Sequence, residues 1–215
     1  MQVTRPIRLV GVLGTHTEVG KTWVGARLLA ALKAQGLTVA ARKPVQSFDS
    51  AVQTDAHCLA DATGESAHTV CPAHRWYPRA MAPPMAADVL GREAILLADL
   101  CAEVTWPQGI DIGLVESIGG PLSPIAHDGD SVDLLNELNV DEVLLIADAG
   151  LGTLNSVRLS LACIERKNVT VFLNRYDAED ELHQLNRDWL VTRYGIIALV
   201  DLGDLATRYA AEVAD

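Results

Sequence analysis

The sequence has few basic residues for its length, and those it has are scattered. Lys and Arg together number 17 against 28 Asp and Glu, which gives a formal net charge of −11. Because nucleic-acid phosphates are bound by grouped Lys and Arg side chains, this balance excludes a nucleic-acid-coating role. We expect an acidic, solvated surface and no nucleic-acid partner.

Paired cysteines and long apolar runs are also missing. The four cysteines lie far apart without a C-x-x-C pair, which excludes a zinc site or a disulfide framework of the usual spacing. We expect them to be buried as small apolar residues in a reducing compartment. No apolar run reaches the roughly 18 residues of a membrane span, and the N-terminal run is too short and interrupted for a signal peptide. The expectation is a cytoplasmic protein without a membrane partner.

What the chain does contain is an alternation of short apolar runs and longer segments with helical spacing. The predicted strands are Ile7–Leu13, Leu37–Val45, Ile110–Val115, Glu142–Ala147, Val169–Leu173 and Ile196–Val200. The predicted helices run over Lys21–Gly36, Thr54–Ala62, Leu154–Arg166 and Glu179–Arg193. This order predicts an α/β fold, a doubly wound and mostly parallel sheet with helices on both faces.

One stretch interrupts the alternation. Residues from Gln46 to about Pro84 are polar and rich in proline, with too few apolar residues for a core of their own. We therefore expect a single domain over residues 1–215, with an insertion at about 46–84 that covers the site. In such sheets, ligands bind at the carboxyl ends of the strands.

The stretch GTHTEVGKT, from Gly14 to Thr22, joins the first predicted strand to the first predicted helix. Its last three residues, Gly20-Lys21-Thr22, match the end of the phosphate-binding pattern G-x-x-x-x-G-K-[ST]. Its first glycine, Gly14, stands one residue earlier than that pattern requires. A loop in this position directs backbone N–H groups and a helix N-terminus at an anion. We expect Lys21 to reach the terminal phosphates and the Thr22 hydroxyl to bind Mg²⁺. The alternative is a glycine turn that only connects strand and helix.

Two carboxylates and a lysine lie at or near the ends of predicted strands. Glu116 closes the strand GLVES, and Asp55 follows the start of the polar stretch. Carboxylates there can bind Mg²⁺ directly or through water, or they can cap helices. Lys43 ends the second strand and can stabilise charge on a moving phosphoryl group. Its alternative is a surface lysine.

Two further segments could bind a ligand. The stretch Leu151–Asn155 opens a predicted helix, and the free N–H groups of a helix start can hold a carboxylate. The alternative is an ordinary N-cap. Asn174, at the end of the strand VTVFLN, could hydrogen-bond an adenine edge or serve as a turn residue.

Together these motifs resemble the dethiobiotin synthetase family, whose phosphate loop also has the early glycine. The matched elements follow in the family's order: GTHTEVGKT, KPVQS, Asp55, ESIGG, LGTLN and Asn174. The resemblance implies a P-loop NTPase fold and an ATP- and Mg²⁺-dependent ligase. Its reaction takes up CO₂ on an amine of 7,8-diaminopelargonic acid. The resulting carbamate attacks the γ-phosphate, and the second amine closes the ring to dethiobiotin, releasing ADP and phosphate.

The resemblance also implies residue roles. Lys21 and Lys43 would stabilise the carbamate and the phosphoryl group as catalytic residues. ATP would be bound by Thr17, Glu18, Val19, Gly20, Lys21, Thr22, Glu116, Gly119 and Asn174. Mg²⁺ would be held by Thr22, Asp55 and Glu116. The diamino acid would meet Thr17 and Ser47, and its distant carboxylate would meet Gly152, Thr153, Leu154 and Asn155 of a second subunit. The family's sites are completed across a homodimer.

The sequence departs from the family's pattern at ligand-facing positions. His16 replaces Asp or Gly, and Ser156 replaces His. Ser117 and Ile118 stand where small residues are usual, and we expect their larger side chains to narrow the place where the backbone approaches the ligand. No proline follows the last predicted strand. These departures leave open a diverged paralogue that activates another carbamate or carboxylate. A nucleotide-switched partner ATPase is the third alternative, although its second loop lysine, expected at about His16, is missing.

Overall fold

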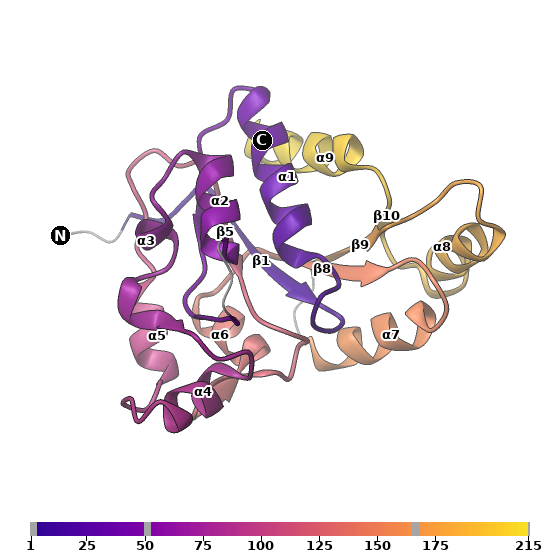
Figure 1. Cartoon of the computed structure of the whole chain (residues 1–215). Helices are drawn as coiled ribbons and strands as arrows, with labels where there is room; N and C mark the ends of the chain where they lie inside the picture. Colours follow the sequence, from indigo (N-terminus) through magenta and orange to yellow (C-terminus); the bar gives the residue numbers. More distant parts are fainter. Residues whose placement is uncertain (1–3, 50–52, 165–167, 215) are drawn as a thin grey trace.

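The centre of the protein is a six-stranded sheet in which every pairing is parallel (Figure 1). The computed structural model describes residues 4–49, 53–164 and 168–214. The strand order is β10-β9-β8-β1-β5-β2. The strands are β1 (Arg8–Gly14), β2 (Val39–Arg42), β5 (Ile112–Glu116), β8 (Glu142–Asp148), β9 (Val169–Asn174) and β10 (Ala198–Leu199). All six predicted strands and the α/β fold class are confirmed.

Two strands are shorter than predicted, each for a local reason. β2 stops at Arg42 because the next backbone N–H, that of Lys43, donates to the carbonyl of Val70 at 2.8 Å instead of pairing within the sheet. β10 lies at the sheet edge and pairs with β9 through only Ala198 and Leu199. Short edge strands are a common way to limit exposed strand edges.

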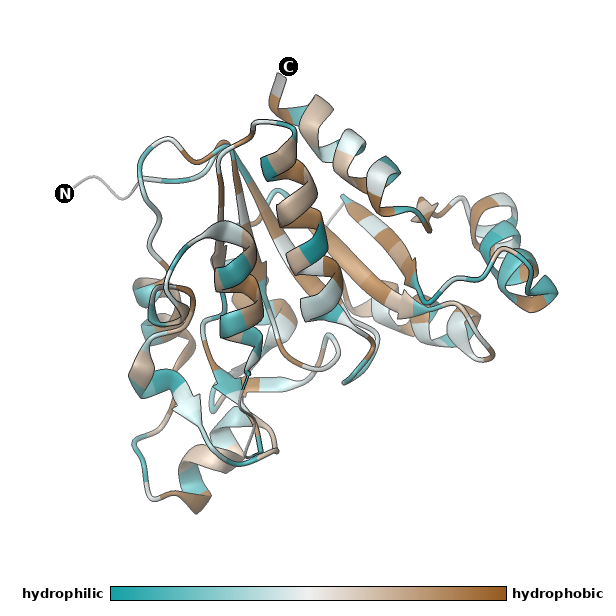
Figure 2. Cartoon of the chain, turned by 45° about the horizontal axis from the view of Figure 1, so that its top comes forward, coloured by the Kyte–Doolittle hydropathy of each residue, from teal (hydrophilic) through white to brown (hydrophobic). Residues whose placement is uncertain are grey.

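Helices cover both faces of the sheet. α1 (Lys21–Ala34), α2 (Asp55–Thr63) and α9 (Leu202–Ala214) lie over one face, and α6 (Ser131–Glu137), α7 (Thr153–Cys163) and α8 (Glu181–Tyr194) over the other. The helices expected at α1, α2, α7 and α8 are confirmed, and the predicted end of α7 at Arg166 lies outside the described residues. Figure 2 shows the matching pattern, with mostly hydrophobic strands between helices of mixed hydropathy.

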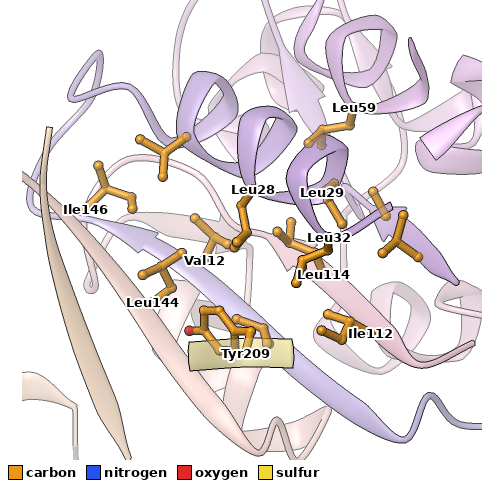
Figure 3. Packing of buried hydrophobic residues seen from close by; sticks show 14 of the residues in the cluster. Val12, Leu28, Leu29, Leu32, Leu59, Ile112, Leu114, Leu144, Ile146 and Tyr209 are labelled. Carbon is orange, nitrogen blue, oxygen red and sulfur yellow. The ribbon is translucent and has the colours of Figure 1, made fainter. Parts of the chain in front are cut away.

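The largest apolar cluster lies between the sheet and the first group of helices. Val12 and Leu144 from the strands meet Leu28 and Leu32 of α1 and Tyr209 of α9 (Figure 3). All five are at most 1% exposed. This packing fixes the start of α1, and therefore the loop that precedes it, against the carboxyl ends of the strands.

The polar stretch predicted as an insertion forms small elements at the side of the sheet. Its helix is α2, and its strands β3 (Gln46–Ser47) and β4 (Trp76–Tyr77) pair in parallel. The same stretch also contains α3 (Ala67–Val70), the 3₁₀ turn η1 (Ala73–Arg75) and the start of α4 (Pro83–Val89). The elements α5 (Leu97–Glu103), β6 (Pro124–Ala126) and β7 (Gly129–Asp130) follow it in the chain. Tyr77 of this stretch packs with Ile95, Leu100 and Ile125 in a separate apolar cluster.

The cysteines are all free, but only one is buried. Cys71 is fully enclosed, whereas Cys58, Cys101 and Cys163 are half-buried on helices. The expectation of four buried cysteines is therefore wrong for three, because each lies near the solvent side of its helix. Within the described residues, none of the helices has the length and apolar character to cross a membrane.

Candidate active site

The sheet order brings three separate parts of the sequence together at one edge. β1 lies between β8 and β5, and β5 pairs with β2, with Val12 opposite Glu116 and Arg42 opposite Val115. The loop after β1, the last residue of β5 and the residue after β2 therefore meet at the carboxyl ends of neighbouring strands. Ligand sites of doubly wound sheets lie at this edge.

Lys43 lies between two carboxylates at this edge. Its ammonium nitrogen is 2.6 Å from Oε1 of Glu116 and 2.9 Å from Oδ2 of Asp55. Burial alone would lower the pKa of Lys43, but the charges of Asp55 and Glu116 outweigh it and raise that pKa. In return, the charge of Lys43 lowers the pKa of Asp55. The lysine is therefore held as a cation, and the alternative of a surface lysine is wrong because its side chain is only 3% exposed.

The phosphate loop contributes Lys21 and Thr22 to the same cluster. Thr22 Oγ1 donates a hydrogen bond of 2.8 Å to Glu116 Oε1, and Lys21 Nζ donates to the Gly119 carbonyl at 3.2 Å. Burial lowers the pKa of Lys21, and the nearby Glu116 partly offsets this. An anion beside Lys21 would restore its preference for the charged form. This arrangement fits a lysine that meets phosphate oxygens.

The oxygen atoms in this cluster suit Mg²⁺. Oε2 of Glu116 is buried and accepts no hydrogen bond from the part of the chain that the structure describes. With Thr22 and Asp55 it offers the hard oxygen donors that Mg²⁺ prefers. No group of three or more His, Cys, Asp or Glu among residues 4–49, 53–164 and 168–214 is arranged to hold a metal. The ion would therefore share its coordination with phosphate and water, as Mg²⁺ usually does.

A cavity of about 840 Å³ opens beside these residues. Its polar lining residues are Thr17, Glu18, Gly20, Lys21, Thr22, Lys43, Asp55 and Gly119. Ser47 and the apolar residues Met81, Ile118 and Pro124 also line it. The Ser47 hydroxyl donates to the Met81 carbonyl at 2.6 Å, so its lone pairs are available to accept a hydrogen bond from a ligand. The cavity thus combines residues suited to phosphate with residues suited to an amine and an aliphatic chain.

A second cavity, of about 590 Å³, shares Gly20 and Trp23 with the first. Asn174 lines it, and the Asn174 side-chain amide donates a 2.9 Å hydrogen bond to the Val19 carbonyl. Residues 200–202, directly after β10, form part of its wall. This place next to the phosphate loop suits a nucleobase. Residues 200–202 form the wall although they lack the proline that is usual in the family after the last strand.

The structure leaves several of the predicted ligand-binding positions outside these cavities. Gly152, Thr153, Leu154 and Asn155 start α7 and line neither cavity of the described chain. Val19 is fully buried and lines neither cavity either. Ser117 is also buried and donates to the Val12 carbonyl at 2.9 Å. The expectation that Ser117 narrows the site is therefore wrong, whereas Ile118 does line the first cavity.

His16 also lies outside both cavities. Its Nε2 is 3.2 Å from Oδ2 of Asp148, and its Nδ1 is 2.6 Å from the carbonyl of Thr17. Both ring nitrogens therefore face oxygen atoms of the protein. His16 is part of a contact between the phosphate loop and the end of β8, and it does not form the wall that an acceptor would meet.

Sequence reasoning missed several residues that line the cavities. Trp23, Tyr176, Asp201 and Leu202 belong to the second cavity, and Met81 to the first. A signal for part of this wall was present in the sequence. The apolar residues Leu202, Leu205, Ala206, Tyr209 and Val213 recur with the spacing of an amphipathic helix. Recognising α9 would have placed residues 200–202 at a helix start beside the sheet.

Comparisons with known proteins agree with this fold. A family model described as an AAA domain matches residues 8–198. Chloroplast FtsY from Physcomitrella patens has a similar fold, with a TM-score of 0.51 and 16% identity over 99% of this chain and 66% of that one.

Closer similarity is found among proteins named ATP-dependent dethiobiotin synthetase BioD. The protein from Haloferax mediterranei is 37% identical over 81% of this chain and 75% of its own length. That from Anaeromyxobacter dehalogenans (strain 2CP-C) is 35% identical over 79% of this chain and 78% of its own length. That from Brachyspira hyodysenteriae is 28% identical over 88% and 89%. The chain therefore belongs to this AAA domain family and to the family of the ATP-dependent dethiobiotin synthetases.

Proposed function

We propose that this protein is an ATP-dependent ligase of biotin biosynthesis. It carboxylates 7,8-diaminopelargonic acid with CO₂ and closes the ring, producing dethiobiotin, ADP and phosphate. The observation that carries this proposal is the buried Lys43, which pairs with Asp55 and Glu116 and lines a cavity together with the phosphate loop. The names of the relatives support the same activity.

The reaction needs no nucleophile from the protein. One amine of the substrate adds to CO₂ and loses a proton, giving a carbamate. A carbamate oxygen attacks the γ-phosphorus of ATP, the bond from that phosphorus to the ADP oxygen breaks, and a carbamic-phosphoric anhydride forms. The second amine then attacks the carbonyl carbon and expels phosphate, which leaves a cyclic urea. Catalysis therefore consists of positioning the reactants and stabilising negative charge.

The two lysines supply that stabilisation. Lys21 and Lys43 both line the first cavity, where the carbamate and the γ-phosphate would meet. Preorganised cations at a place where charge develops are worth more in a partly dry site than in water. Thr22, Asp55 and Glu116 would hold Mg²⁺, which neutralises charge on the β- and γ-phosphates when bound.

The apolar residues that line the cavity match the rest of this substrate. Ser47 and Thr17 both line the cavity and would contact the amines. Met81, Ile118 and Pro124 would pack along the aliphatic chain. Asn174, in the second cavity, would contact the adenine base.

A second subunit would complete the site. The start of α7, Gly152–Asn155, has backbone N–H groups that can hold a carboxylate, but it lines neither cavity of its own chain. Leu151 beside it is 93% exposed, which suits a surface that a partner covers. We therefore propose a homodimer. We also propose that it lies in the cytoplasm and that each chain is one domain in which residues 46–84 cover the site.

The proposal is tested by incubating the protein with ATP, Mg²⁺, bicarbonate and 7,8-diaminopelargonic acid, and measuring dethiobiotin by mass spectrometry. Dethiobiotin, ADP and phosphate should appear in equal amounts. ATP binding without dethiobiotin would reject this substrate. It would favour a paralogue with another acceptor, because Ile118 alters the acceptor wall. ATP turnover only with a protein partner would favour the nucleotide-switched alternative.

A further inference from the structure

The phosphate loop is tied to the ends of β8 and β9 by contacts from side chains at those strand ends. Arg175 follows the last residue of β9, and its Nη2 donates a 2.9 Å hydrogen bond to the carbonyl of Glu18. Asn174, the residue before it, donates to the next loop carbonyl, that of Val19. Two successive carbonyls of the loop are therefore held by two successive residues of the strand end.

The direction of these carbonyls decides what the loop can bind. An anion-binding loop presents its backbone N–H groups to the ligand, so its carbonyls must turn away and find donors elsewhere. Glu18 has a left-handed backbone, with φ of 63°. This conformation is unfavourable for a residue that has a Cβ atom. The hydrogen bond from Arg175 lies where it can hold Glu18 in that conformation.

Arg175 is itself fixed by charges on neighbouring elements. Its Nη1 lies 2.7 Å from Oδ1 of Asp148, the last residue of β8. The other carboxylate oxygen of Asp148 contacts His16 at 3.2 Å. The loop segment from His16 to Glu18 is therefore held at both ends. Asp148 contacts His16 directly, and it also contacts Arg175, which holds the Glu18 carbonyl.

We propose that Arg175 is a positioning residue that holds the phosphate loop in its anion-binding conformation, with Asp148 orienting the guanidinium. Arg175 acts through the Glu18 carbonyl and not by touching the reacting atoms. The proposal rests on the proposed function only in requiring that phosphates bind at this loop. Removing Arg175 should weaken the binding of phosphates and leave the chemical step, which depends on Lys43 and Lys21, largely intact.

The test compares binding of Mg²⁺-ATP and of inorganic tripolyphosphate by calorimetry, without the diamino acid, in wild type and Arg175→Ala. Because one charge-assisted hydrogen bond of an exposed guanidinium is lost, we expect about two- to fivefold weaker binding of both ligands. Tripolyphosphate is included because Arg175 also lines the second cavity. If only ATP binding weakens, Arg175 contacts the base and the proposal is wrong. Unchanged affinity for both ligands would also overturn it.

Conservative variants separate positioning from a structural role. Arg175→Lys keeps the charge but has one nitrogen, which cannot hold Asp148 and the Glu18 carbonyl together, so its affinity should be intermediate. Asp148 lines neither cavity. The variant Asp148→Asn should nevertheless weaken the binding of both ligands, as Arg175→Ala does. Arg187→Ala, an arginine on α8, is the matched control and should bind as wild type does.

Steady-state kinetics and unfolding complete the test. KM for ATP should rise with kcat nearly unchanged in Arg175→Ala. A fall in kcat at constant KM would contradict a positioning role. The unfolding midpoint without nucleotide reports whether each variant folds, and if Arg175→Ala does not, Arg175→Lys and Asp148→Asn decide the question. If the wild-type protein binds ATP but makes no dethiobiotin, the proposed function is rejected, and the binding test of Arg175 can still be made.

Discussion

Lys43 and Glu116 form an ion pair of 2.6 Å although they lie 73 residues apart in the sequence. Their side chains are 3% and 0% exposed. Burying two charges carries a large desolvation penalty, and a buried ion pair is weak evidence for stability. A role in the reaction explains its presence better, because the pair keeps a cation beside the phosphate loop.

The first prediction concerns this cation. Lys43→Ala should lower kcat for dethiobiotin formation by about 100-fold or more, because a preorganised charge at the reacting centre is lost. Its affinity for ATP, measured by calorimetry, should change little. Lys33→Ala is the control, since Lys33 Nζ contacts the Thr63 carbonyl and lines neither cavity. Normal turnover of Lys43→Ala would exclude a catalytic role for that lysine.

The second prediction concerns metal binding. Glu116→Gln removes the charge of a carboxylate whose Oε2 has no hydrogen-bond partner in the described chain. The Mg²⁺ concentration for half-maximal ATP turnover should rise by about tenfold or more, because a charged ligand is replaced by a neutral one. Glu137→Gln, an exposed position on α6, should keep the wild-type value. Equal Mg²⁺ curves for Glu116→Gln and wild type would remove Glu116 from the metal site.

The third prediction concerns stability and pH. The charge of Lys43 lowers the pKa of Asp55 in the folded state, so the folded protein binds this proton less readily than the unfolded chain. The resulting stabilisation is present above the unfolded pKa of about 3.9 and is lost as pH falls through the lower folded pKa. Asp55→Asn lacks it. The difference in unfolding midpoint between wild type and Asp55→Asn should be largest near pH 7 and shrink in acid.

Asp61→Asn, on the exposed side of the same helix, serves as the control for this measurement. It should show little difference from wild type at either pH. A difference for Asp55→Asn that stays constant between pH 7 and the acid range would mean that the Asp55 charge does not contribute through Lys43.

The fourth prediction concerns α9. The hydroxyl of Tyr209 is buried and has no hydrogen-bond partner within the described residues. Because an unsatisfied buried polar group is destabilising, Tyr209→Phe should raise the free energy of unfolding by about 1 kcal/mol. For a chain of this size the thermal midpoint should rise by roughly 2–4 °C. Tyr194→Phe, on the partly exposed surface of α8, should leave it unchanged. A lower midpoint for Tyr209→Phe would indicate that the hydroxyl has a partner.

The fifth prediction concerns the acceptor. Ile118→Ala removes part of the apolar wall, so KM for 7,8-diaminopelargonic acid should rise about tenfold if the aliphatic chain packs there. KM for ATP should stay the same. Leu122→Ala is the control, because Leu122 is 62% exposed and lines neither cavity. A lower KM for Ile118→Ala would show that Ile118 obstructs this substrate, as expected of a paralogue with a different acceptor.

The sequence was sufficient for the sheet and for the polar centre of the site. Strands such as β8 are continuous apolar runs, and residues at their carboxyl ends must meet at one edge of a parallel sheet. The sequence alone could therefore place Lys43 and Glu116 at the same edge of the sheet.

Contacts between distant surface positions could not be predicted in this way. The link from Arg175 to Asp148 and the Glu18 carbonyl depends on side-chain rotamers at two strand ends and on the left-handed turn at Glu18. Ser117 and Ile118 show the same limit, because adjacent residues at a strand end point in different directions, and only the structure shows which one faces the cavity.

Gly20 connects the two cavities in a way that restricts how the site can change. A Cβ at this position would lie 2.2 Å from Nδ2 of Asn174, and the backbone φ is 99°. Any side chain here would have to displace the amide that holds the Val19 carbonyl. The residue that would contact the base and the loop that would hold the phosphates therefore cannot be altered independently. In this protein, a mutation that reshapes the nucleobase end should also change how the loop binds the triphosphate. Nucleotide selectivity and phosphate affinity should therefore evolve together.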